Sequence, residues 1–164
     1  MMIDQLLVHG LKDFPVDEKG RIVKGRRFSI YMAEKFKALL PLKESRAEIL
    51  SCISVSHTIR SRKNKANLIA IVKFSNRDMR NIIFYAKKSL KGSKIAITEH
   101  LTPATLDLLN TTKKLFGRSD VWTSQTKVKV RVYERTYTIK SHDDAYSLKQ
   151  WATNNNTVTN NNHN

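Results

Sequence analysis

Cationic side chains recur at every second position of one short segment. Lys127, Lys129 and Arg131 alternate there with three valines. A period of two places the valines on one face of a strand and the three cations on the other. Such a row suits the phosphates of a nucleic-acid strand. The alternative is an exposed strand whose charges block edge pairing, but protection alone rarely needs three cations without an acid. We therefore favour phosphate binding.

A second cationic region spans residues 60–94, where eleven basic residues accompany one acidic residue, Asp78. Each of its parts alone could equally be a solvated surface, but together they favour a continuous basic groove. Tyr133 is added as an aromatic that could stack on bases, whereas Trp122 is interpreted as a core or partly buried residue. The candidate nucleic-acid-binding residues of the region are Arg60, Arg62, Lys63, Lys65, Arg80, Lys87, Lys88, Lys91 and Lys94.

The composition supports polyanions as partners. The net charge of +16 and the pI near 10.1 favour nucleic acid first and anionic membrane second. No apolar run approaches the roughly 18–20 residues that span a bilayer, so no membrane insertion is expected. The N-terminal residues lack a signal-peptide pattern, and the single cysteine, Cys52, fits a reducing compartment. We expect the cytoplasm or nucleus of the host cell, without secretion.

Residues that could do catalysis are poorly arranged. The five histidines are scattered, none forms a zinc-protease motif, and the sequence has no glycine-rich phosphate loop. The adjacent pair Asp143-Asp144 fits the start of a helix better than general acid–base work. Glu99-His100 is the one tempting dyad and is given little weight. We expect no enzyme, no catalytic residue, no metal, no cofactor and no small-molecule substrate.

The elements of the first half follow a recognisable order. The patterns predict strands at residues 5–11, 49–59, 68–74 and 94–99, and helices at 28–40 and 79–90. Ser75 and Asp78 have the spacing of an N-terminal cap. The βαββαβ order predicts a ferredoxin-like, RRM-like domain over residues 1–100. Two helices would cover one face of its sheet and leave the other face free.

The second half predicts a smaller unit of order α-β-β-β-α, over residues 101–152. Thr102 and Pro103 are typical of a helix start. Three short strands are predicted at 121–124, 127–133 and 137–140, and a last helix at 143–151. Residues 153–164 are predicted to be a disordered, Asn-rich tail. The predicted fold class is thus α+β, with two domains.

The third predicted strand differs from an RNA-reading one. An RRM that reads RNA on its sheet carries stacking aromatics in this strand. Here those positions hold Ile69 and Ile71, and each missing stack is worth about 1–3 kcal/mol. We therefore expect the sheet not to read bases by stacking, and its aliphatic free face to pack against something else, such as the second unit.

The second half also resembles a known family. The runs KGSKIAITEHLTPATLDLL, VWT, KVKVRV and YTIKSHDD resemble the C-terminal region shared by baculovirus few-polyhedra (FP) proteins and first-open-reading-frame proteins of LINE-type retrotransposons. RSRKNKANLIAIVKFSNRDMRNII is similar to the basic loop, third strand and second helix of that family's RRM-like domain. The resemblance covers most of residues 4–150 and is strongest over 60–142.

The resemblance implies a fold and an activity. It implies an RRM-like domain followed by a small C-terminal domain, and binding of single-stranded nucleic acid by basic residues in the cleft between them. Nucleic-acid chaperoning is implied by the retrotransposon members. The matching positions are Arg60, Arg62, Lys63 and Lys65 in the basic loop, Lys87, Lys88, Lys91 and Lys94 around the fourth strand, and Lys127, Lys129 and Arg131 in the C-terminal strand.

Two departures from the family pattern affect the expectations. The usual Asn-Gly after VWT is Gln125-Thr126 here, which predicts a different hairpin. Family members also commonly carry an N-terminal coiled coil through which they oligomerise, whereas this sequence starts at the first predicted strand. Self-association therefore stays open.

The sequence thus predicts binding of single-stranded nucleic acid, with RNA favoured over DNA and little sequence specificity. The alternative, from another functional class, is a viral structural or assembly factor of the FP type. Such a protein would act in virion or occlusion-body morphogenesis, and its basic surface would meet acidic protein partners.

Overall fold

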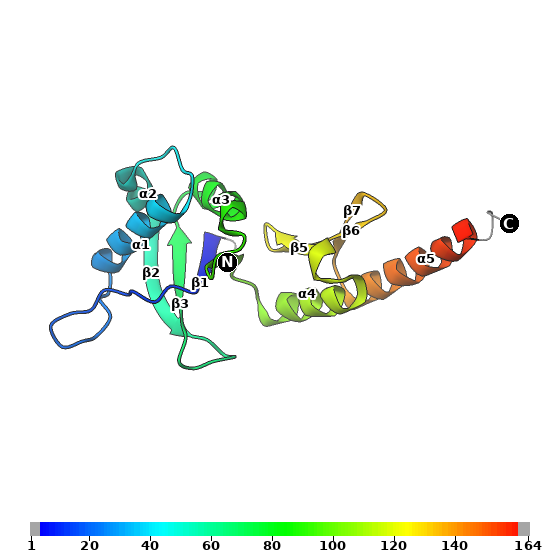
Figure 1. The fold of residues 1–164 in the computed structure, drawn as a ribbon, viewed down its shortest axis with the longest axis horizontal. Helices are drawn as coiled ribbons and strands as arrows, with labels where there is room; N and C mark the ends of the chain where they lie inside the picture. Colours follow the sequence, from blue (N-terminus) through cyan, green and yellow to red (C-terminus); the bar gives the residue numbers. More distant parts are fainter. Residues whose placement is uncertain (1–3, 161–164) are drawn as a thin grey trace. The chain divides into compact units, whose positions relative to one another are not determined.

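The computed structural model describes residues 4–160. The chain divides into two compact units, the first ending at His100 and the second beginning at Leu101. Unit 1 contains a four-stranded sheet and unit 2 a three-stranded sheet, each accompanied by helices (Figure 1). The fold is therefore of the α+β class, as predicted.

The sheet of unit 1 is antiparallel throughout, with strand order β2-β3-β1-β4. The central strands are therefore β3, whose apolar sequence predicts a central place, and β1. Residue alternation places Leu6, Ala70 and Val72 on the buried face, and Leu7 and Ile71 on the opposite face. The strands are β1 (Gln5–His9), β2 (Ile53–Arg60), β3 (Leu68–Phe74) and β4 (Ala96–Glu99).

Helices cover one face of this sheet. Apolar residues of α1 and α3 form a single core with the inward side chains of β1, β3 and β4. Its largest members include Phe28, Phe36 and Phe84, each at most 2% exposed. The helical elements of unit 1 are α1 (Arg26–Leu39), α2 (Arg46–Cys52), α3 (Arg77–Ala86) and the short η2 (Lys87–Leu90).

The prediction of a strand from residue 49 is wrong at its start, because residues 46–52 form α2. Ser45 Oγ accepts a hydrogen bond from the backbone N–H of Glu48 at 3.2 Å. Ser45 and Glu48 thus have the spacing of a capping box, which starts a helix that ends at Cys52. Strand β2 begins only at Ile53.

The cap of α3 is also one residue from its predicted place. Asn76 Oδ1, and not the Ser75 hydroxyl, accepts from the backbone N–H of Met79 at 3.1 Å. The apolar spacing of this segment predicts Ile82 on the buried face of the helix, but Ile82 is 39% exposed and Phe84 is buried.

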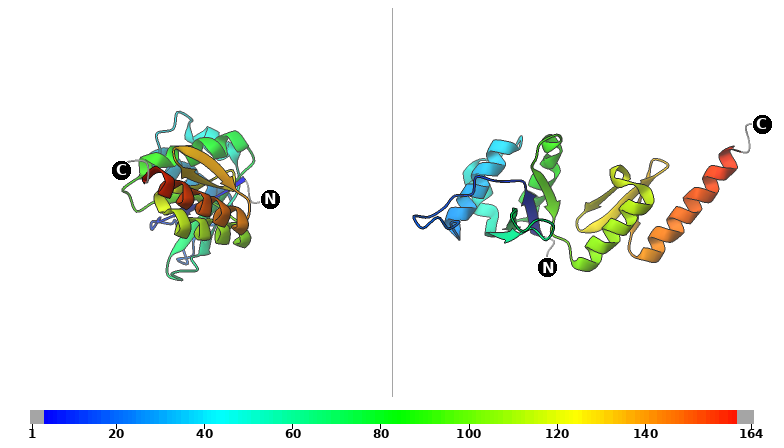
Figure 2. Two further views of the ribbon diagram at one scale, coloured as in Figure 1. Left: turned by 90° about the vertical axis from the view of Figure 1, so that its right-hand side faces the viewer. Right: turned by 60° about the horizontal axis from the view of Figure 1, so that its bottom comes forward.

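Unit 2 is a three-stranded antiparallel sheet, order β5-β6-β7, with α4 and α5 side by side (Figure 2). Thr102 Oγ1 accepts from the backbone N–H of Thr105, so the predicted cap of α4 is confirmed. The core joins Leu108 and Leu109 to valines of β6. The elements are α4 (Pro103–Phe116), η3 (Arg118–Asp120), β5 (Val121–Ser124), β6 (Lys127–Val132), β7 (Arg135–Ile139) and α5 (His142–Asn160).

Two tight turns connect the strands of unit 2. Gln125 and Thr126 have φ of 52° and 63°, and Tyr133 and Glu134 have φ of 49° and 65°. Two positive values in succession are what a type I′ hairpin turn requires. The first hairpin is therefore a two-residue turn although the favoured Asn-Gly pair is absent. Strand β6 pairs on both sides, and we infer that this pairing offsets the cost of the left-handed residues.

Helix α5 continues into the predicted tail. It runs to Asn160, whereas the sequence predicts the folded part to end at residue 152 and disorder from 153. Asn lowers helix stability by only tenths of a kcal/mol per residue relative to better formers, and residues 152–164 contain neither Gly nor Pro. Thr153 Oγ1 also donates to the carbonyl of Lys149 at 2.9 Å. The last part of the predicted tail, 161–164, lies outside the described residues.

Gly10 brings the end of β1 against the segment before β4. Its φ is 88°, and a Cβ added there would lie 2.1 Å from the carbonyl oxygen of Lys94. We expect Gly10→Ala to destabilise the protein by about 1–3 kcal/mol from the backbone conformation alone, and by more from the clash. The measurement is the free energy of unfolding in urea.

Gly20→Ala is the matched control for this prediction. Gly20 also has a positive φ, 73°, but no atom lies within 4 Å of the added Cβ. Its substitution should lower the free energy of unfolding only by the contribution of the backbone conformation. Equal losses for the two variants would contradict the close approach of Gly10 to Lys94.

Candidate nucleic-acid interface

The strand register of unit 1 brings three loops to one end of its sheet. His9, the last residue of β1, pairs with Ala96, the first of β4, and Arg60 at the end of β2 pairs with Leu68 at the start of β3. The segments that follow or precede these residues therefore meet at the same end. Their exposed cations, here named the loop-end cluster, are Lys12, Arg60, Arg62, Lys63, Lys65, Lys91 and Lys94.

The β2–β3 loop has a defined shape. Ser61 N–H donates to the carbonyl of Asn67, and Asn67 N–H donates to that of Asn64, both at 2.9 Å. The Arg60 guanidinium donates to the carbonyl of Lys65 at 3.0 Å. These internal bonds fix the loop backbone, so the charged ends of its remaining cations are presented to solvent.

Three of the lysines that the sequence predicts to bind nucleic acid line a shallow hollow of about 540 Å³ beside β4. Lys87, Lys88 and Lys91 line it together with apolar residues such as Leu90 and Ile97. Lys87 Nζ lies 3.8 Å from the centre of the Phe84 ring, a cation–π contact. The hollow thus combines apolar side chains with three lysines.

Arg80 is a correction to the predicted site. Its side chain is 1% exposed and pairs with Glu99 in the core of unit 1, with 2.5 Å between Nη2 and Oε2. Nη1 donates to Asn81 Oδ1 at 3.1 Å, and the guanidinium lies over the Phe84 ring. The prediction placed Arg80 on the solvent face of its helix. It faces the sheet instead, and it cannot reach a phosphate in the folded protein.

The sheet of unit 2 carries its cations on the face opposite the helices. The predicted alternation is confirmed, because Val128 and Val130 are buried while Lys127 and Arg131 are exposed. In the register, Lys129 stands between two residues that share its face, Trp122 on β5 and Thr138 on β7. We name the face formed by Lys127, Lys129, Arg131 and Trp122 the cationic sheet face.

Trp122 is partly buried and lies beside a cation of β6. Its ring centre lies 5.8 Å from the Arg131 guanidinium. Lys129 Nζ donates to Thr138 Oγ1 at 2.5 Å. An aromatic ring beside three cations offers a base-stacking surface together with phosphate ligands.

Tyr133 lies in the β6–β7 turn and is half exposed. Its hydroxyl donates to the carbonyl of Ala152 at 2.7 Å, and its ring meets Trp151 edge-on at 5.9 Å. These contacts attach α5 to the hairpin. Stacking on a base is therefore limited to the part of the ring that α5 leaves exposed.

Two histidines of unit 1 have lowered pKa values. Burial lowers the pKa of His9, and burial together with His57 lowers the pKa of His100. Both therefore remain neutral at pH 7. The acid nearest the loop-end cluster in sequence, Asp13, accepts from Lys35 and Tyr31, and the hydrogen bond from Lys35 holds its pKa below the usual range. The field at this end is set by lysine and arginine.

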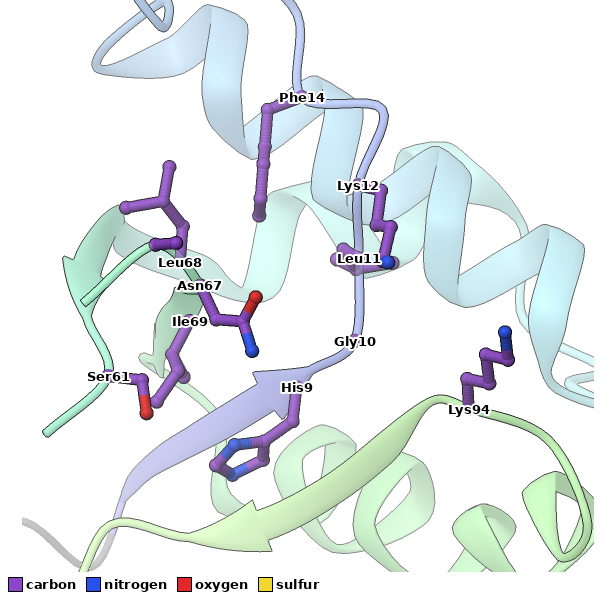
Figure 3. Close-up of a pocket in the computed structure, with 11 residues that line it drawn as sticks. His9, Gly10, Leu11, Lys12, Phe14, Ser61, Asn67, Leu68, Ile69 and Lys94 are labelled. Carbon is purple, nitrogen blue, oxygen red and sulfur yellow. The ribbon is translucent and has the colours of Figure 1, made fainter. Parts of the chain in front are cut away.

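A cleft of about 570 Å³ opens within the loop-end cluster (Figure 3). It is lined by Lys12 and Lys94, together with uncharged residues that sequence reasoning did not select, notably His9, Phe14 and Asn67. Gly10, the glycine that ends the first predicted strand, is the sequence signal for a close approach here. The convergence itself depends on the register of strands that are far apart in the chain.

No protein-family model matches this chain, and no curated protein matches it at a significant level. Within residues 4–160, no three His, Cys, Asp or Glu side chains are placed to hold a metal ion together. In the same residues, every helix is too short or too polar to cross a bilayer. The functional argument therefore depends on the geometry of the two cationic surfaces.

Proposed function

We propose that this protein binds single-stranded nucleic acid, RNA in preference to DNA, with little dependence on sequence. The observation that carries the proposal is the loop-end cluster. Seven exposed cations from three separate loops gather at one end of a sheet, and the acid nearest them in sequence, Asp13, is already paired. The cationic sheet face of unit 2 adds three cations in a row.

The proposal extends to the fold of unit 1. Its antiparallel strand order, β2-β3-β1-β4, with helices on one face, is the arrangement expected of an RRM-like domain. We further propose kinship with the FP and LINE first-open-reading-frame proteins. Ile69 and Ile71 lie on the sheet face away from the core. This supports a mode in which phosphates, and not bases stacked on the sheet, supply most of the affinity.

Single strands fit these surfaces better than duplex. The cations lie on loops and on a sheet face, and a flexible strand can adapt to each such surface. Trp122 would offer a stacking partner that only unpaired bases can use.

Salt dependence is the direct test. If about 6–8 phosphates are neutralised, log affinity for a single strand should fall with log salt at a slope of about −4 to −6. Fluorescence anisotropy of labelled single-stranded RNA, single-stranded DNA and duplex, titrated at several salt concentrations, measures it.

Polyglutamate of matched length and charge is the control in the same assay. It carries negative charge without bases or phosphates, and should bind at least tenfold more weakly. A slope near zero, or equal affinity for polyglutamate, would contradict the proposal. Equal affinity for polyglutamate would favour acidic protein partners, as expected of a viral assembly factor.

A further inference from the structure

The cleft at the loop end of unit 1 differs from the rest of the cationic surface because its interior is not only charged. Figure 3 shows Phe14 and Asn67 pointing into it from two different segments, the chain after β1 and the end of the β2–β3 loop. Its volume, about 570 Å³, is in the range of small-ligand pockets, about 300–1,000 Å³. One nucleotide unit is therefore a suitable occupant by size.

Phe14 is held in place by the core. Its ring stacks on Phe28, with centres 6.1 Å apart and planes at 22°, and it also contacts Tyr31 at 5.9 Å. Both partners belong to α1 and are buried. A ring fixed in this way loses little freedom when a flat ligand stacks on it, which favours binding.

Asn67 combines a fixed backbone with an available side chain. Its N–H and carbonyl are both used in the hydrogen bonds that close the β2–β3 loop. Its carboxamide makes no hydrogen bond within residues 4–160. One amide group supplies a donor and an acceptor side by side, the pair with which Asn recognises a base edge.

Two lysines complete the cleft. Lys12 follows β1 and Lys94 precedes β4, and both are exposed at its border. Neither ammonium group forms an ion pair within the described residues. Both can therefore meet phosphates of a strand whose base enters the cleft.

We propose that this cleft binds a single unstacked nucleobase of the bound strand. Phe14 stacks on the base, Asn67 hydrogen-bonds its edge, and Lys12 and Lys94 contact the flanking phosphates. The inference rests on the proposed function and adds to it a site at which a base, and not only the backbone, is recognised. Strand β3 carries Ile69 and Ile71 at the positions where an RNA-reading RRM has stacking aromatics. In this proposal the stacking ring comes instead from the chain after β1.

The first experiment crosses a change in the protein with a change in the ligand. A single-stranded oligonucleotide is compared with an abasic strand of equal length and phosphate number. The ratio of the two affinities is expected to fall about tenfold in Phe14→Leu and severalfold in Asn67→Ala, with an unchanged salt slope. Asn110→Ala, an exposed position on α4, is the matched control and should leave the ratio unchanged.

The second experiment does not need strand binding. The full chain is titrated with adenosine monophosphate or with ribose 5-phosphate while the side-chain amide signals of Asn67 are followed by NMR. The base-containing ligand should shift these signals, and the sugar phosphate should not. Because this measurement uses the unsubstituted chain, a folding defect in Phe14→Leu cannot affect it.

The outcomes separate the inference from the proposed function. If strands bind with the expected salt slope but the affinity ratio is unchanged in both variants, the inference is overturned and the function stands. If strands do not bind but the nucleotide shifts Asn67, the cleft is supported and the proposed function fails. Equal shifts with ribose 5-phosphate would overturn base recognition, and no shift together with no strand binding would overturn both.

Discussion

Replacing Lys127, Lys129 and Arg131 together by alanine is expected to weaken the binding of single-stranded oligonucleotides about a hundredfold near 0.1 M salt. Each phosphate contact on a single strand contributes about 0.7 to the salt slope, and hence about 0.7 log units of affinity at that concentration. Three contacts give about 2 log units, and the slope should become less steep by about 2. Anisotropy titrations at four salt concentrations measure both quantities.

The matched control removes the same charge elsewhere. Lys19, Lys24 and Lys43 are exposed in unit 1 and lie outside both cationic surfaces, so their triple alanine variant should change affinity by less than about threefold. Equal losses in the two variants would show that net charge alone matters. A loss confined to some sequences would show that the cationic sheet face reads bases.

Replacing Arg80 by alanine is expected to lower the free energy of unfolding by about 3–5 kcal/mol. The substitution leaves Glu99 buried without its cation, since both side chains are at most 1% exposed and their closest atoms are 2.5 Å apart. It also removes the guanidinium from the Phe84 ring. Urea unfolding followed by circular dichroism measures the loss.

The double variant Arg80→Met, Glu99→Leu separates the buried charge from the packing. Because the two apolar side chains fill a similar volume without charge, most of the lost stability should return. Its salt slope for single strands should equal that of the original protein. A loss below 1 kcal/mol for Arg80→Ala, or a reduced slope in the double variant, would place Arg80 at the surface and restore it to the interface.

Local patterns predicted most of the elements. The alternation over residues 127–132 specified which face of β6 is buried, because period two is the geometry of a strand. Thr102 and Pro103 located the start of α4 because a threonine hydroxyl accepts from the free N–H groups of the first turn and proline has no N–H to satisfy. Helix α2 was missed because the apolar residues from Ile49 onward fit a helix or a strand equally well. The deciding signal, Ser45 with Glu48, precedes them.

The site could be predicted only in part. Cations on loops tend to stay in solvent, and Arg62, Lys63 and Lys65 are exposed as the basic loop in the sequence indicates. Arg80 was misassigned because its partner, Glu99, comes close only when β4 joins the sheet. The cleft residues Phe14 and Asn67 are unremarkable in sequence, and only the register of β1 with its neighbours places them together.

The two units differ in the sequence separation between strands that pair. In unit 1, Val8 pairs with Ala70 and His9 with Ala96. During synthesis β1 therefore stays without a sheet partner until β3 and β4 have emerged. In unit 2, β5, β6 and β7 pair with their sequence neighbours through two-residue turns. Because local contacts shorten the search for the native state, unit 2 should have the faster folding phase, and the loop-end cluster should form late, when the first strand closes the sheet.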